Sequence, residues 1–70
     1  MPYVIKKDDI ISFLDRLFSV YKYQAGNVTL LPVRKDSRGY VVNGNAQIFS
    51  AKQVRQKAIF VDHFIHEKLD

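Results

Sequence analysis

The amino-acid sequence predicts a small α+β domain in which a three- or four-stranded, mostly antiparallel sheet is covered by two helices. Segments 10–21 and 51–69 both carry apolar residues at helical spacing. Between them, short β-prone segments are separated by turn residues, among them Asn43-Gly44. The expected element order is therefore α-β-β-β-α, and both helices would bury their apolar faces against one side of the sheet.

The composition is that of one small globular domain spanning residues 1–70. The hydrophobic content is 47%, which is enough for a packed core. Because the chain has no cysteine, disulfides and thiolate metal sites are excluded. No apolar run is long enough to cross a bilayer and no signal-peptide pattern is present, so we expect a cytoplasmic protein without membrane contact.

The first predicted helix begins at Asp8 and Asp9 and ends near Tyr23. Acidic residues suit a helix start because they accept from the free N–H groups and complement the dipole. Phe13 and Val20 lie outside the main apolar stripe and widen it. Residues 1–7 are expected to form a flexible end or a short edge strand. The apolar stripe consists of Ile10, Ile11, Leu14, Leu17, Phe18 and Tyr21.

The middle of the chain predicts three strands. Residues 28–34 form the first, and Pro32 indicates either an edge strand or a point where its pairing stops, since proline cannot donate to a ladder. After a polar turn at 35–39, residues 40–42 and 45–49 are expected to pair as a hairpin. Asn43-Gly44 supplies the turn, because both residues tolerate positive φ.

The second predicted helix runs from about Ala51 to Leu69. Ser50 is its expected N-cap, with Gln53 three residues later reaching back. Ile59 and Phe60 lie off the main apolar face. The residues expected to face the core are Ala51, Val54, Ala58, Val61, Phe64, Ile65 and Leu69.

Basic residues at the start of this helix are the strongest candidate for a functional surface. The formal net charge is +4, which permits binding to an anionic polymer. Lysine and arginine suit phosphate, glutamine suits sugar or base edges, and Tyr21, Tyr23 and Tyr40 could offer stacking faces to bases or pack at the edge of the core. An ordinary solvated basic face is the alternative. The candidate residues are Lys52, Arg55, Lys57, Gln53 and Gln56, extended by Arg34, Lys35 and Arg38.

The predicted element order and the segment after Ser50 resemble the double-stranded-RNA-binding domain. That family opens its second helix with Ser-Lys-Lys-x-Ala-Lys-x-x-Ala-Ala, and Ser50, Lys52, Arg55 and Ala58 fall on matching positions, whereas Ala51 replaces the first lysine. The resemblance implies that Lys52 and Arg55 contact phosphates and that segment 34–39 enters a minor groove. Nucleic acid is therefore the first expected partner, and its form is left open.

A protein partner is the second expectation. Phe13, Val20, Ile59 and Phe60 are apolar residues beyond the predicted core stripes, and such an excess often marks a subunit or partner interface. The chain would then act as a homodimer or dock on another protein. The edge strand 28–33 is an alternative docking element, because free strand edges pair readily.

Neither catalysis nor a cofactor is expected. The four serines have no neighbouring base or motif, and the three glycines stand singly in turns. His63 and His66 are three residues apart, but no third ligand has a suitable spacing, so we expect solvent-exposed histidines rather than a metal site. The predicted protein is a non-enzymatic binding module.

Overall fold

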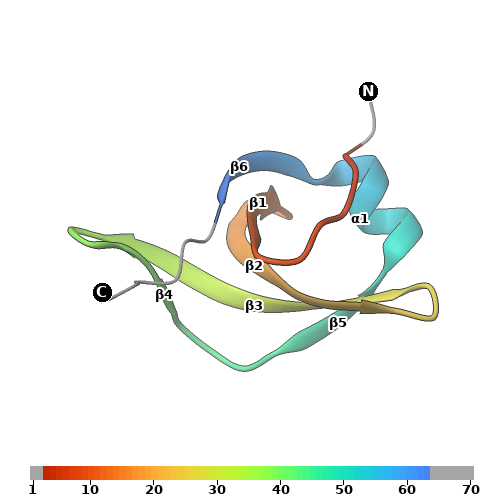
Figure 1. The fold of residues 1–70 in the computed structure, drawn as a ribbon, viewed down its shortest axis with the longest axis horizontal. Coiled ribbons are helices and arrows are strands. Elements are labelled where there is room, and N and C mark those ends of the chain that lie inside the picture. Colours follow the sequence, from red (N-terminus) through yellow and green to blue (C-terminus); the bar gives the residue numbers. More distant parts are fainter. Residues whose placement is uncertain (1–2, 64–70) are drawn as a thin grey trace, which may run out of the picture.

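Within residues 3–63, which the computed structural model describes, the chain forms six antiparallel strands and one short helix (Figure 1). The predicted α+β fold with two covering helices is therefore wrong, because most of the first predicted helix is strand and the second is helical only over Ala51–Lys57 before β6 begins. The elements are β1 (Asp9–Phe13), β2 (Arg16–Gln24), β3 (Asn27–Asp36), β4 (Gly39–Val42), β5 (Gln47–Ser50), α1 (Ala51–Lys57) and β6 (Ile59–His63). No helix of the described residues is long and apolar enough to span a bilayer.

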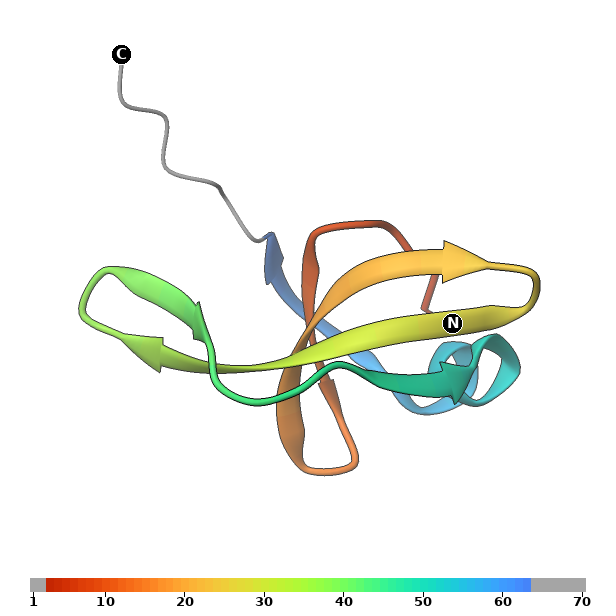
Figure 2. The same cartoon turned by 90° about the horizontal axis from the view of Figure 1, so that it is seen from below.

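The sheet is built around β3. The strand order of the sheet is β4-β3-β2-β1-β6, and β5 also pairs with β3. Since β2 occupies one edge of β3, β4 and β5 share the other edge and follow each other along it. Figures 1 and 2 show the sheet coiling, with α1 forming the connection from β5 to β6. Within residues 3–63, the outer edges of the sheet are thus the β4–β5 edge and β6.

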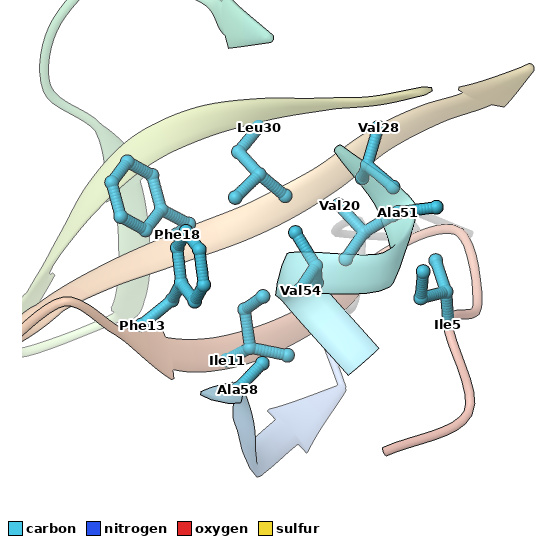
Figure 3. Packing of buried hydrophobic residues seen from close by; sticks show 10 residues of the cluster. All are labelled: Ile5, Ile11, Phe13, Phe18, Val20, Val28, Leu30, Ala51, Val54 and Ala58. Atoms are coloured by element: carbon cyan, nitrogen blue, oxygen red, sulfur yellow. The ribbon is translucent and has the colours of Figure 1, made fainter. Parts of the chain in front are cut away.

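The core lies on the inner face of this coiled sheet. Figure 3 shows Val54 pointing from α1 toward Leu30, Val20 and Ile11. At one end, the ring of Phe13 packs edge-on against Phe18 and Phe49, with ring centroids 6.3 and 5.1 Å apart. The buried cluster comprises Ile5, Ile11, Phe13, Phe18, Val20, Val28, Leu30, Ala51, Val54 and Ala58.

The first predicted helix is a β-hairpin formed by β1 and β2. A two-residue turn joins the strands, and both turn residues have positive φ, 54° at Leu14 and 63° at Asp15. This is the primed turn geometry that matches strand twist, although leucine is an unusual residue for it. Phe13 and Val20, which did not fit the helical stripe, are core residues, because every second residue of a strand faces the same side and they share the inner face with Ile11 and Phe18. Tyr21, predicted to be buried, is exposed.

The second predicted helix ends after seven residues at Lys57. Ala58 is extended, with φ −77° and ψ 147°, and Ile59 begins β6. The N-cap prediction is confirmed, because the Ser50 hydroxyl accepts the Gln53 backbone N–H at 3.4 Å. The predicted burial of Ala51, Val54 and Ala58 is also confirmed. Val61, predicted to be buried, is exposed, and residues 64–69 of the predicted helix lie outside the described residues.

The prediction that Asn43-Gly44 joins two paired strands as a hairpin is wrong. β4 and β5 do not pair with each other; segment 43–46 is a break between two strands that both pair with β3. The break faces Pro32, whose carbonyl accepts the Asn43 N–H at 2.7 Å. Gly44 has φ +140°, and a Cβ there would lie 3.2 Å from Pro32 Cγ, so the close approach requires glycine.

Segment 28–33 is not an edge strand, because β3 is paired along both edges. The alternative prediction, that strand pairing stops at Pro32, is correct for the edge of β3 that pairs with β4 and β5. At the N-terminal end, residues 3–6 form no strand. The Tyr3 N–H donates to the Arg55 carbonyl at 3.1 Å, and Ile5 is buried in the core. This segment therefore contacts both α1 and the core.

The positive φ angles of Leu14 and Asp15 in the β1–β2 turn lead to a prediction about stability. Replacing Leu14 by Asn and Asp15 by Gly supplies the residues that the turn prefers, so we expect unfolding free energy to rise by about 1 kcal/mol. Urea denaturation followed by circular dichroism measures this change. Leu14→Ala is the control, because it removes the exposed side chain and keeps the backbone strain. A gain as large in the control would contradict the explanation.

Candidate nucleic-acid interface

The predicted basic residues fall into two groups at opposite ends of the molecule. Lys52 and Arg55, here called the α1 cluster, lie on the short helix, whereas Arg34, Lys35 and Arg38, the hairpin cluster, lie at the β3–β4 turn. Figures 1 and 2 show these two regions at opposite ends of the long axis, along which the molecule extends 36 Å. The single continuous surface expected from the sequence is therefore two separate surfaces.

Helical phase divides the residues of α1. At about 100° per residue, Lys52 and Arg55 lie about 60° apart, and Gln56 falls beside Lys52. Lys57 lies about 160° from Arg55, on the other flank. Gln53 is half-buried, and its backbone N–H is used by the Ser50 cap. Lys57 and Gln53 therefore do not belong with the α1 cluster.

A tyrosine from β2 completes the α1 cluster. The Arg55 guanidinium donates from Nη1 to the Tyr23 hydroxyl at 3.0 Å, across 32 residues of sequence. Tyr23 is 49% exposed, and it lies on the part of β2 that extends beyond the pairing with β1. Its register partner is Val28 of β3, which is in turn paired with Phe49. The arrangement offers a cation and an aromatic ring on one accessible surface.

The hairpin cluster has a mixed character. Lys35 Nζ lies 5.8 Å from the ring centroid of Tyr40, its register partner across the hairpin. The Arg38 backbone N–H donates to the Asp36 carboxylate at 2.7 Å, which stabilises the turn. Asp36 also adds a negative charge in the middle of the cluster. In contrast, the first turn of α1 has no acidic residue, so we favour the α1 cluster for an anionic ligand.

The four residues predicted for a protein interface also separate. Phe13 and Val20 are core residues with no accessible surface to offer a partner. Ile59 and Phe60 lie on β6 and are well exposed. Of the four residues, only Ile59 and Phe60 therefore have surface available to a partner.

A buried carboxylate at the start of β1, which the sequence did not predict, forms a polar network. Asp9, predicted to start a helix, is a strand residue with 3% exposure. Its Oδ2 accepts the Tyr3 hydroxyl at 2.5 Å, and its Oδ1 lies 3.2 Å from His63 Nδ1. The three side chains come from the N-terminal segment, β1 and β6. No local signal could reveal a contact between residues 54 positions apart.

This network has a structural role. Burial, followed by the hydrogen bond to Asp9, raises the pKa of the Tyr3 hydroxyl above its ordinary value, so the neutral donor form is favoured. Among residues 3–63 no three histidine or carboxylate side chains are grouped to hold a metal ion, and His66 lies outside the described residues. The network therefore ties the N-terminal segment and β6 to β1.

Removing the Tyr3 hydroxyl is expected to destabilise the fold. Tyr3→Phe leaves buried Asp9 without this donor, which costs about 1–3 kcal/mol of unfolding free energy. Urea denaturation at neutral pH measures the change. Tyr40→Phe removes the same atom from a half-buried ring, and we expect it to change stability by less than about 0.5 kcal/mol. Equal effects in both variants would contradict a special role for Tyr3.

The parent protein and Tyr3→Phe also test the direction of the Tyr3 pKa shift. Because the folded-state pKa is raised, the native state holds the proton more tightly than the unfolded state. This contribution is fully present below the ordinary tyrosine pKa of about 10 and disappears as the pH rises above it. We therefore expect the stability difference between the parent and Tyr3→Phe to shrink above about pH 10. A constant difference would contradict the shift.

Comparison with known proteins finds no matching family model, and no curated protein or solved structure matches the chain significantly. The α-β-β-β-α order on which the resemblance to the double-stranded-RNA-binding domain depended is not found in the described residues. Function is therefore inferred from the geometry of this chain alone.

Proposed function

We propose that this protein is a non-enzymatic nucleic-acid-binding module that binds single-stranded segments through the α1 cluster and Tyr23. The observation that carries the proposal is the hydrogen bond from Arg55 to the Tyr23 hydroxyl, which joins a cation and an exposed ring. Lys52 adds a second cation on the same flank of α1. A net charge of +4 supports an anionic ligand.

The two kinds of side chain match the two parts of a nucleotide. Lys52 and Arg55 suit phosphate oxygens, because lysine and arginine release condensed counterions when they neutralise the backbone. The Tyr23 ring suits a base, since every base has a face that can stack on an aromatic side chain. The guanidinium beside the ring adds a cation that can itself stack on a base.

A single strand fits this surface better than a duplex. A base can reach the Tyr23 ring only when it is unstacked and unpaired. The seven-residue helix is also less than two full turns long, so it offers little length for insertion into a groove. A single-stranded ligand therefore replaces the duplex that the resemblance to the double-stranded-RNA-binding domain implied.

The proposed pairing of Lys52 and Arg55 with phosphates is tested by Lys52→Glu/Arg55→Glu. We expect the double variant to bind a labelled single-stranded oligonucleotide at least about tenfold more weakly in a fluorescence anisotropy titration. The slope of log affinity against log salt should fall by about 0.7 for each phosphate that the variant no longer neutralises. Lys35→Glu/Arg38→Glu makes the same charge change at the opposite end, and we expect it to retain most of the affinity. An equally weakened control would contradict the assigned surface.

The stacking of a base on Tyr23 is tested by two substitutions. Tyr23→Ala is expected to weaken binding by about 1–3 kcal/mol, because it removes a stacking face. Tyr23→Phe keeps the ring and removes the hydroxyl that accepts from Arg55, so it should bind close to the parent. The same titration is run with single-stranded and duplex RNA and DNA at low and moderate salt. Absence of binding to every form at low salt would overturn the proposed function.

A further inference from the structure

A shallow hollow lies on the outer face of the sheet, beside the turn that joins β2 to β3. Figure 2 shows β2, β3 and β5 side by side at this end of the molecule. The hollow is open to solvent and has a volume of about 270 Å³, slightly below the roughly 300 Å³ at which enclosed ligand sites begin. It can therefore hold one unit of a chain but cannot enclose a large cofactor. Its lining residues are Lys22, Gln24, Ala25, Asn27, Thr29 and Ile48.

The strand register places these side chains on one surface. Lys22 is the partner of Thr29, and Thr29 is in turn the partner of Ile48, so the three form a row across β2, β3 and β5. Gln24 and Asn27 are partners two residues farther along the same two strands, and they form a second row on the same face. The strand pairing and the hollow thus select the same five side chains.

The polar groups around the hollow are available to a ligand. Its ammonium, two amides and hydroxyl form no side-chain hydrogen bond or ion pair within residues 3–63. None of the lining residues is acidic, so no carboxylate opposes an anion there. An ammonium suits a phosphate, and amides and a hydroxyl suit sugar or base edges. Ile48, which is 69% exposed, offers an apolar contact to the face of a sugar or base.

The hollow and Tyr23 lie on opposite faces of the same segment of β2. Tyr23 is paired with Val28, whose side chain is in the core, whereas Lys22 and Gln24 flank Tyr23 and point to the other face. All three β2 residues are exposed. β2 pairs with β1 only as far as Ser19, so among the described residues no strand covers the edge of β2 beside Tyr23. A nucleic-acid strand can therefore cross this edge from the α1 cluster to the hollow.

We propose that the hollow binds one nucleotide of the single strand that contacts the α1 cluster and Tyr23, with a phosphate on Lys22 and the sugar or base against the amides, the hydroxyl and Ile48. The inference rests on the proposed function, because the same strand must bind the α1 cluster. It extends the contact surface from one face of the β2–β3 hairpin to both.

The phosphate contact is tested by Lys22→Gln. We expect this variant to bind a labelled single-stranded oligonucleotide about threefold to tenfold more weakly in an anisotropy titration, and the slope of log affinity against log salt to fall by about 0.7. Lys35→Gln removes the same charge at the opposite end of the molecule, and we expect it to bind like the parent. Parental affinity and slope in Lys22→Gln would overturn the proposal, and so would an equal loss in Lys35→Gln.

Two-dimensional NMR of the isotope-labelled parent protein locates the ligand directly. We expect the oligonucleotide to shift the side-chain amide signals of Gln24 and Asn27 and to leave that of Asn45, which lies between β4 and β5 and does not line the hollow, in place. Equal shifts with inorganic phosphate at the same phosphate concentration would reveal an anion site only and overturn the nucleotide assignment. Shifts at Tyr23 and Arg55 with none at Gln24 or Asn27 would overturn this inference and leave the proposed function standing. Absence of binding anywhere would overturn both.

Discussion

The fold depends on the apolar contact between α1 and the inner face of the sheet. No strand pairing joins β5 to β6 among the described residues, so the coiled sheet is not closed by hydrogen bonds alone. Ala51 and Val54 cover this opening by packing with Val28, Leu30 and Ile11 (Figure 3). Full burial of a valine-sized side chain contributes about 1.5–3 kcal/mol, a large share of the net stability of so small a domain.

The same contact also determines where the proposed nucleic-acid-binding surface lies. With Ala51 and Val54 turned inward, helical phase leaves Lys52 and Arg55 on one flank of α1, and Arg55 reaches Tyr23 from β2. The chain then leaves the helix at extended Ala58 and runs directly into β6. Asp9 holds this strand through His63 and holds the N-terminal segment through Tyr3, so two sequence-distant segments are fixed to β1 by one buried carboxylate.

Local signals in the sequence predicted the elements that depend on local physics. The Ser50 cap, the inward residues of α1 and the strand around Val28 follow from capping and spacing alone. The β1–β2 hairpin was missed because Leu14-Asp15 is not a typical turn sequence and the flanking apolar residues fit both periods. The contacts of Arg55 and Asp9 depend on topology, which no local pattern in this chain encodes.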